Sequence, residues 1–285
     1  MPVFFEQNLI DSWINEDAPL LDLTSQVMGL HHQASQMTFI ARGNYIVAGS
    51  EEVMRVITNC QGQVTDYLPS GTSCHAGQAI LHCTGPAHAL LRAWKVSQNI
   101  FEFACGIATQ THALVTTVKH HNSKAAVLTT RKHAPGLRKL ALKATLAGGA
   151  MPHRLGLSET VLIFPQHRAL LGDWQNIQAA LQARQGELAE KTVVIEVETL
   201  EQAKQAIQAG ADALQFDKVP AAQLTEWVSQ LRPLHPHLRF LAAGGIRLDN
   251  AVAYACSGVD ALVTSSLYYA PPADIGVRIE KGDAQ

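Results

Sequence analysis

The chain has little net charge with which to attract an extended anionic partner. It carries 22 Lys and Arg against 24 Asp and Glu in 285 residues, a net charge of −2 with neutral histidines. A chain of this balance has no global field that would draw nucleic acid or an anionic membrane surface. We therefore expect neither as a partner, and any anion must be held by a local cluster of cations.

Cysteines and long apolar runs are also scarce. The five cysteines are scattered, and no two form a CxxC pair. This pattern argues against a disulfide scaffold or a structural zinc site and favours a reducing compartment. The start, MPVFFEQNLIDSW, lacks a basic segment followed by an apolar run, and no apolar stretch is long enough for a membrane span. We expect a cytoplasmic protein.

The apolar residues are arranged in two different ways along the chain. Hydrophobic residues make up 47% and charged residues 16%, as in compact globular proteins. The first third has a mixed α/β pattern and includes a long helix from Pro86 that we expect to end near Gly106, before a second helix over 107–121. After residue 122, short apolar runs alternate with helical segments, which is typical of βα units and favours a barrel. The runs are AAVLTT, ETVLIF, KTVVIEV, ADALQF, LRFLAAGG and VDALVTSS.

Polar and small residues stand at or beside the ends of these apolar runs. In a βα barrel the carboxyl ends of the strands carry the active site. The residues there are Arg131, Lys132, His153, Arg154, Glu196, Glu198, Asp217, Gly244, Gly245, Ser265 and Ser266. One rim would thus gather cations, carboxylates and two small turns. The last two turns suit a phosphate, which backbone N–H groups and hydroxyls can bind.

Each of these residues also has a structural alternative. A cation at a strand end can pair with a carboxylate, a carboxylate can cap a helix, and a glycine pair can serve a tight turn. Three further cations, Arg138, Lys139 and Lys143, are expected on an exposed helix face. The thirteen histidines show no spacing typical of a metal site, so the spacing itself predicts no metal site.

Ordered motifs run from about residue 15 to the end of the chain. They are LRAWKVSQNIFEFACGIATQT, TTRKHAPGLRKLALKATLAGGAMPHRLGL, IEVETLEQAKQAIQAGADALQFD, AAGGI and GVDALVTSSLYYAPPADIGVRIE. This set resembles the quinolinate phosphoribosyltransferase family, also called nicotinate-nucleotide pyrophosphorylase. The variants AWKVSQN and HRLGLSETVLIFP are most similar to its ModD branch, which is associated with molybdenum-transport genes.

The resemblance implies a fold and an assembly. The expected fold class is α/β, with an N-terminal α/β domain plus an incomplete α/β barrel. We place the first domain at residues 1–110 and the barrel at 111–270, and we expect the tail 271–285 to return to the first domain. The family implies a dimer or larger homo-oligomer with a shared active site.

The resemblance also implies a reaction. The expected enzyme is a glycosyltransferase of the pentosyltransferase class, which transfers a phosphoribosyl group from phosphoribosyl pyrophosphate to a quinolinate-like aromatic carboxylate and releases pyrophosphate. Catalytic roles are implied for Lys132, Glu196 and Asp217. Substrate binding is implied for Lys95, Arg131, His153, Arg154, Gly244, Gly245 and Ser265. Mg²⁺ is expected to enter with the substrate, with Glu196 and Asp217 as its candidate ligands.

Departures from the family pattern lie mainly on the acceptor side. Phe164 stands where the family has a lysine, His133 where it has a threonine, and Lys95 where it has an arginine that reaches into the neighbouring subunit's site. Ala243 and Ser265 replace a serine and a glycine. Because the donor-side carboxylates and the glycine pair persist, we expect retained binding of a phosphoribosyl group and a changed acceptor.

Two other functions stay open from the sequence. One is a non-catalytic or accessory anion-binding protein linked to molybdate transport, which would use the same cleft without turnover. The other is a phosphosugar isomerase or aldolase barrel. That reaction needs a lysine or a general base at a strand end, and only Lys132 and Lys218 are plausible lysines.

Overall fold

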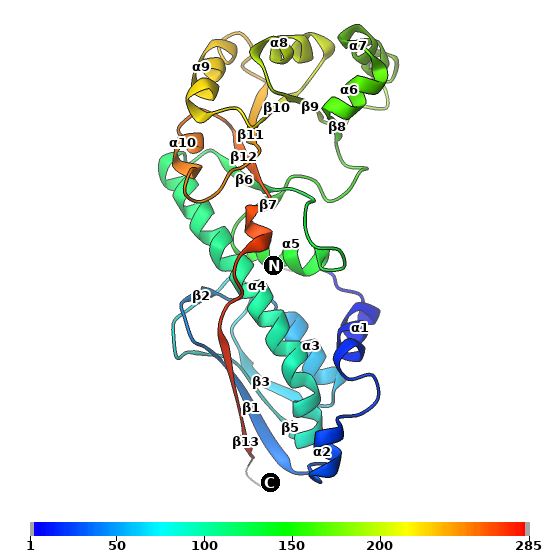
Figure 1. The fold of residues 1–285 in the computed structure, drawn as a ribbon, viewed down its shortest axis with the longest axis vertical. Coiled ribbons are helices and arrows are strands. Elements are labelled where there is room, and N and C mark those ends of the chain that lie inside the picture. Colours follow the sequence, from blue (N-terminus) through cyan, green and yellow to red (C-terminus); the bar gives the residue numbers. More distant parts are fainter. Residues whose placement is uncertain (1–2, 283–285) are drawn as a thin grey trace. The chain divides into compact units, whose positions relative to one another are not determined.

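The structure is a computed structural model that describes residues 3–282 (Figure 1). The chain forms two compact units. The first contains the residues up to His112, Ala134–Gly149 and the residues from Tyr268 on, and the second contains Ala113–His133 and Ala150–Leu267. Segment 134–149 thus belongs to the first unit, whereas the sequence placed it in the barrel. Among the described helices, none has the length and apolar character of a membrane span.

The first unit is built around a small antiparallel sheet. Its helices are α1 (Gln7–Asp17), α2 (Leu23–Val27), α3 (Ser50–Asn59), α5 (Arg138–Ala147) and α4 (Ala87–His121), whose last residues belong to the second unit. Its strands are β1 (Ala34–Ala41), β2 (Tyr45–Ile46), β3 (Gln63–Tyr67), β4 (Ser73–Cys74), β5 (Ala79–Pro86) and β13 (Ile275–Lys281). The four-stranded sheet has the order β13-β1-β5-β3, so the chain's tail pairs with β1, and β2 pairs with β4.

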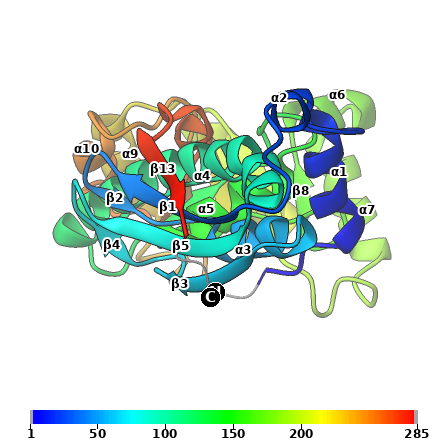
Figure 2. The same cartoon turned by 90° about the horizontal axis from the view of Figure 1, so that it is seen from below.

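Alternation along β1 explains which face of this sheet is buried. Met37, Phe39 and Ala41 are fully buried, while the residues between them are partly exposed. This period of two is that of a half-buried strand. The apolar face packs in one core with α3 and α4, and Figures 1 and 2 show α4 lying alongside the strands.

The expected helix break at Gly106 is wrong. Helix α4 runs without interruption from Ala87 to His121. A Cβ atom at Gly106 would lie 2.3 Å from the carbonyl oxygen of Pro271, so this glycine lets the returning tail approach the helix closely. Glycine weakens a helix by about 1 kcal/mol relative to alanine, and a 35-residue helix packed on a core tolerates that cost.

The expected exposure of Lys143 is also wrong. Its side chain is 3% exposed, and its Nζ donates to Glu51 Oε2 at 2.6 Å and to both carboxylate oxygens of Glu52. Burial acts to raise the pKa of the Glu51 carboxyl, but hydrogen bonds from Lys143 and Ser70 outweigh it and lower the pKa to about 2. Lys139, by contrast, keeps a half-exposed ion pair with Glu6. The helical period could not separate the two lysines, because the buried carboxylates come from a distant helix.

The second unit is a series of strands and helices. Its strands are β6 (Ala126–Thr129), β7 (Met151–Pro152), β8 (Val161–Ile163), β9 (Val193–Val197), β10 (Ala213–Asp217), β11 (Arg239–Ala243) and β12 (Ala261–Thr264). Its helices are α6 (Pro165–Leu171), α7 (Trp174–Ala183), α8 (Leu200–Ala209), α9 (Ala221–Leu231) and α10 (Ala251–Ala255). A 3-10 helix, η1 (Ser266–Tyr269), follows β12. Only the two-residue strand β7 had no counterpart among the predicted apolar runs.

All seven strands are parallel and have the order β7-β6-β12-β11-β10-β9-β8. The outermost strands, β7 and β8, share no ladder. Even so, the guanidinium carbon of Arg154, after β7, lies 6.0 Å from the ring centroid of Phe164, after β8. The sheet therefore curls until its two edges approach at their carboxyl ends. This confirms the expected incomplete α/β barrel.

Candidate active site

Strand alternation decides which side chains enter the barrel. Val194 and Ala213 belong to a small inner cluster of apolar residues, whereas Val193 and Leu214 pack in the outer core with the helices. Residues two and four positions further along a strand share its face. The inward positions near the carboxyl ends are therefore Glu196 on β9, Gln215 and Asp217 on β10, and Ser265 just after β12.

The carboxylates form one group at this end of the barrel. Glu196 and Gln215 are register partners, and Gln215 Nε2 donates to Glu196 Oε2 at 2.6 Å. Burial raises the pKa of the Glu196 carboxyl; the hydrogen bond from Gln215 opposes the rise, the charge of Asp217 adds to it and that of Lys132 opposes it. Lys132 and Asp217 are thus both near Glu196. Two carboxylates that repel each other beside a cation are suited to binding a further positive charge.

Arginines gather at the neighbouring strand ends. Arg131 follows β6 and Arg154 follows β7, and these strands pair in the sheet. The Arg154 side chain is only 8% exposed, and across residues 3–282 it makes no ion pair or hydrogen bond; its close neighbour is the Phe164 ring. Burial lowers the pKa of Arg154, and the charge of Arg131 lowers it further. The charge of Glu159 opposes these shifts, but no carboxylate within residues 3–282 forms an ion pair with Arg154, so this buried guanidinium beside a second arginine is well suited to binding an anion.

His153 stands beside this pair as a neutral group. Its backbone N–H donates to the carbonyl of Thr129 at 2.9 Å, which continues the β6–β7 ladder. Burial lowers the pKa of the imidazole, and the charge of Arg154 lowers it further. His153 can therefore donate one hydrogen bond at neutral pH without adding a third positive charge.

The glycine pair shapes the turn after β11. Both residues have left-handed backbone angles, with φ of +85° at Gly244 and +73° at Gly245. A Cβ atom at Gly244 would lie 2.6 Å from Asp217 Oδ1 and 2.7 Å from the backbone nitrogen of Lys218, while one at Gly245 would meet nothing within 4 Å. Gly244 thus allows the turn to lie against Asp217, and Gly245 faces open space. An open, glycine-lined turn beside a carboxylate leaves room for a phosphate and its cation.

Two lysines considered in the sequence analysis, Lys95 and Lys218, have different surroundings. Lys95 lies on α4 in the first unit, where its Nζ is 4.4 Å from the Trp94 ring centroid and donates to Gln98 Oε1 at 3.1 Å. Lys218 is exposed and pairs with Asp217 at 3.5 Å. A Schiff-base lysine is usually desolvated in an apolar pocket, whereas Lys218 is exposed and paired with a carboxylate. This weakens the isomerase or aldolase alternative.

Two residues that the sequence analysis did not select lie in the same region. Gln215 is 5% exposed and its Oε1 has no partner among the described residues. Arg168 lies on α6, and its Nε is likewise buried without a partner in the described part of the chain. Gln215 could have been predicted from the alternation along β10, because it lies two residues before Asp217 and so faces the same side of the sheet. Arg168 gave no such signal, since it follows the strand end by several residues.

Comparison with known proteins assigns the family. The model of the quinolinate phosphoribosyl transferase C-terminal domain matches residues 107–278, and the model of its N-terminal domain matches residues 22–105. The chain belongs to the quinolinate phosphoribosyltransferase family. The expected membership and the pentosyltransferase class of enzyme are thereby confirmed.

Individual relatives agree with this assignment. The chain is 39% identical over 239 residues to ModD of Rhodobacter capsulatus, covering 84% of this chain and 91% of that protein. It is 31% identical over 268 residues to human nicotinate-nucleotide pyrophosphorylase, covering 93% and 88%. The solved nicotinate-nucleotide pyrophosphorylase of Francisella tularensis superposes with a TM-score of 0.87 at 25% identity, covering 96% and 95%. The higher identity to ModD confirms the predicted similarity to that branch.

Proposed function

We propose that this protein transfers a phosphoribosyl group from phosphoribosyl pyrophosphate to an aromatic carboxylate related to quinolinate, and that its acceptor differs from quinolinate. One observation carries the proposal. Arg154 is nearly buried beside Arg131 without an ion pair or hydrogen bond to any described residue, at the same end of the barrel as the carboxylates of Glu196 and Asp217. Such a rim offers anion-binding groups on one side and cation-stabilising groups on the other.

The acceptor is assigned to the side of Arg131, His153 and Arg154. Guanidinium groups bind carboxylates through two parallel hydrogen bonds, and neutral His153 can add a third donor. Phe164 gives this side an aromatic face, with Arg154 6.0 Å from its ring centroid and His167 stacked on it at 5.9 Å. We place the acceptor ring beside Phe164, whose uncharged side chain stands where the family has a lysine and so offers no ion pair to a second carboxylate. We therefore favour an aromatic acceptor with less negative charge than quinolinate.

The donor is assigned to the side of Lys132, Glu196, Asp217, Gly244, Gly245 and Ser265. In the transfer, the bond between the ribose anomeric carbon and pyrophosphate breaks, and the acceptor's ring nitrogen forms the new bond. The pyrophosphate leaves with the bonding electron pair. Glu196 and Asp217 would stabilise the positive charge that develops on the ribose, and Lys132 would stabilise the departing anion. The open turn at Gly245 leaves room for the 5′-phosphate.

Mg²⁺ forms part of the proposal as an ion that arrives with the donor. No group of three or more potential ligands that could hold a metal occurs within the described residues. The two carboxylates Glu196 and Asp217 nevertheless fit the ion, because Mg²⁺ is commonly held by one or two carboxylates together with substrate phosphates and water. When bound, it would neutralise charge on the pyrophosphate.

Two further properties implied by the family remain proposals. One is a cytoplasmic homo-oligomer in which Lys95 contributes to the active site of a neighbouring subunit. Light scattering coupled to size exclusion tests the assembly. Mixing Lys95→Ala chains with Arg131→Ala chains tests the shared site, because hybrid oligomers should regain part of the activity that each variant lacks. No recovery on mixing would contradict sharing.

A pyrophosphate-release screen tests the proposed function. Phosphoribosyl pyrophosphate and Mg²⁺ are combined with quinolinate, nicotinate, other aromatic carboxylates and nucleobases. At least one acceptor should release pyrophosphate, and Arg154→Gln should abolish it. Arg239→Gln is the matched control, because Arg239 is an exposed arginine at the start of β11. We expect Phe164→Lys to improve the use of quinolinate. High-affinity binding of molybdate without pyrophosphate release from any acceptor would favour the accessory anion-binding function instead.

A further inference from the structure

Arg168 is a partly buried cation that neither the sequence motifs nor the proposed reaction uses. It lies on α6, which begins directly after Phe164 at the end of β8. The start of this helix is fixed by the Phe164 backbone N–H, which donates to His167 Nδ1 at 3.0 Å. The Phe164 and His167 rings stack at 5.9 Å with an interplanar angle of 20°. Arg168 therefore projects from a locally ordered first turn, not from a free loop.

The guanidinium of Arg168 is oriented but not satisfied. Its Cζ lies 5.1 Å from the ring centroid of Trp174, the first residue of α7, so the planar group rests on an aromatic face. Its Nε is buried and has no partner, and within residues 3–282 its side chain forms no ion pair or hydrogen bond. Buried polar groups in folded proteins nearly always have partners. The terminal guanidinium nitrogens are not among the buried atoms and have no partner within the described residues, so they can donate hydrogen bonds to a ligand.

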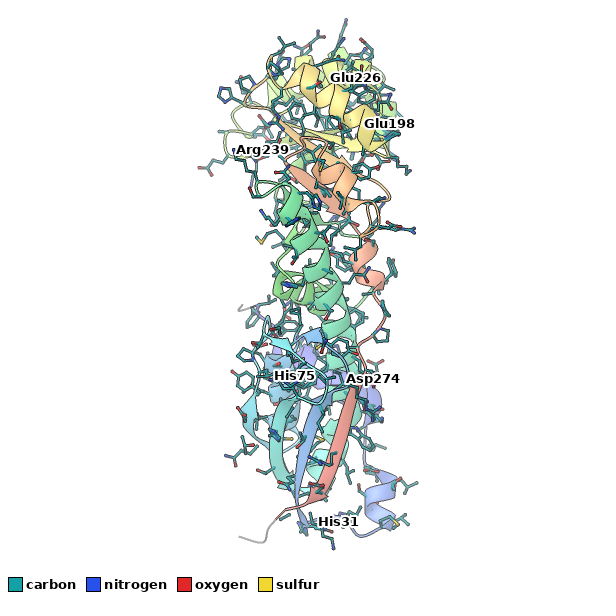
Figure 3. All side chains as sticks on the ribbon, turned by 90° about the vertical axis from the view of Figure 1, so that its left-hand side faces the viewer. His31, His75, Glu198, Glu226, Arg239 and Asp274 are labelled. Carbon is teal, nitrogen blue, oxygen red and sulfur yellow. The ribbon has the colours of Figure 1, made fainter. Side chains whose placement is uncertain are left out.

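The position of Arg168 separates it from the other arginines. Strand β8 pairs with β9, and Glu196 and Glu198 lie at the carboxyl end of β9. Figure 3 shows Glu198 and Arg239 on opposite sides of the second unit. Burial lowers the pKa of Arg168, while the charges of Glu198 and then Glu196 oppose that shift. Arg154, by contrast, is affected by Arg131 and Glu159. Arg168 therefore lies on the carboxylate side of the barrel end.

We infer that Arg168 binds the diphosphate group of the donor substrate through the terminal N–H groups of its guanidinium. This inference rests on the proposed function and adds a specificity-determining residue to it. A guanidinium fork matches two oxygens of a phosphate, and stacking on Trp174 holds the fork in place before the ligand arrives. The nearby carboxylates suit the Mg²⁺ that accompanies a diphosphate. Phe164, at the strand end itself, has no charge to offer.

Equilibrium binding of inorganic pyrophosphate in the presence of Mg²⁺ tests this directly. We expect Arg168→Gln to weaken binding at least tenfold and Arg168→Lys to weaken it less, because lysine keeps the charge but loses the planar fork. Arg239→Gln is the control and should bind like the wild type. Thermal unfolding shows whether each variant is folded. If Arg168→Gln does not fold, the affinity of Arg168→Lys for pyrophosphate still tests the inference.

Steady-state kinetics separates this role from a structural one. Arg168→Gln should raise KM for phosphoribosyl pyrophosphate and leave KM for the acceptor unchanged, whereas Arg131→Gln should do the reverse. Wild-type affinity for pyrophosphate in Arg168→Gln, no pyrophosphate binding by the wild type, or an equal rise in both KM values would overturn the inference. If the wild type binds pyrophosphate in an Arg168-dependent way but transfers no phosphoribosyl group, the proposed function fails and the diphosphate site stands.

Discussion

The two glycines of the turn after β11 allow a controlled test of how that turn is built. Both have φ in the left-handed region, at +85° and +73°, so alanine is strained at either position. They differ in their surroundings. A Cβ atom at Gly244 would lie within 2.6–2.7 Å of Asp217 Oδ1, Lys218 Cγ and the Lys218 backbone nitrogen, whereas one at Gly245 would meet nothing within 4 Å. The pair Gly244→Ala and Gly245→Ala therefore separates backbone strain from steric overlap.

The magnitudes follow from these contacts. The left-handed conformation costs about 1–2 kcal/mol for a non-glycine residue, and this cost is common to both variants. The side chains of Asp217 and Lys218 can turn away from a new methyl group. The Lys218 nitrogen cannot, because its N–H donates to the carbonyl of Ala243 at 2.8 Å in the ladder between β10 and β11. Overpacking against such a fixed atom costs about 1–3 kcal/mol, so Gly244→Ala should destabilise by that much more than Gly245→Ala.

Chemical unfolding measured by circular dichroism provides the assay. We expect both variants to unfold at lower denaturant than the wild type, with Gly244→Ala clearly the lower of the two. Gly244→Ala should also weaken binding of phosphoribosyl pyrophosphate, since Asp217 must move. Equal destabilisation by the two substitutions would refute the close approach of this turn to β10.

Four other substitutions test particular contacts. Lys143→Met leaves the buried carboxylate of Glu52 and its half-buried neighbour Glu51 without their cation, so we expect about 3–5 kcal/mol of destabilisation by chemical unfolding. Lys139→Met, which removes only a half-exposed pair with Glu6, should cost less than about 1 kcal/mol, and equal effects would contradict the burial of Lys143. Gly106→Ala would stabilise a free helix by about 1 kcal/mol, but its new Cβ atom would overlap the carbonyl oxygen of Pro271, so we expect a net loss of stability; a gain would refute that overlap. Asp217→Asn should lower the pKa of Glu196 toward 4.5, because the Asp217 charge helps to raise it. Because the pKa of Glu196 is raised in the folded state, this carboxyl stabilises the fold at pH values below its unfolded pKa, and that stabilisation is lost as the pH rises through its folded pKa. The loss should be smaller in Asp217→Asn. Carboxyl NMR titration measures the pKa of Glu196. An unchanged pKa in Asp217→Asn would show that the two carboxylates do not interact.

The barrel could be predicted from the sequence because its signals are local. Each buried strand is a short apolar run followed by a helical segment, and six of the seven strands were found this way. The rim residues Arg131, Glu196 and Asp217 followed from the rule that the carboxyl ends of parallel strands meet at one edge. Strand β7 was missed because two residues, Met151 and Pro152, carry no period.

The features that could not be predicted depend on contacts between distant segments. The helical spacing of Lys143 does not distinguish it from the more exposed Lys139. Only the packing of α5 against α3 brings its side chain to Glu51 and Glu52. Gly106 looks like a helix end until the returning tail is seen against it. Arg168 has the spacing of an ordinary helix cation, and its role depends on Trp174 and on the carboxylates after β9.

Isothermal titration of phosphoribosyl pyrophosphate with Mg²⁺ into the protein is the most direct test of the central claim, that one end of the barrel seats a phosphorylated sugar between arginines and carboxylates. We expect saturable binding with one site per chain, weakened at least tenfold in Glu196→Gln and unchanged in Arg239→Gln. No detectable binding by the folded wild type, or equal binding by all three proteins, would contradict the claim.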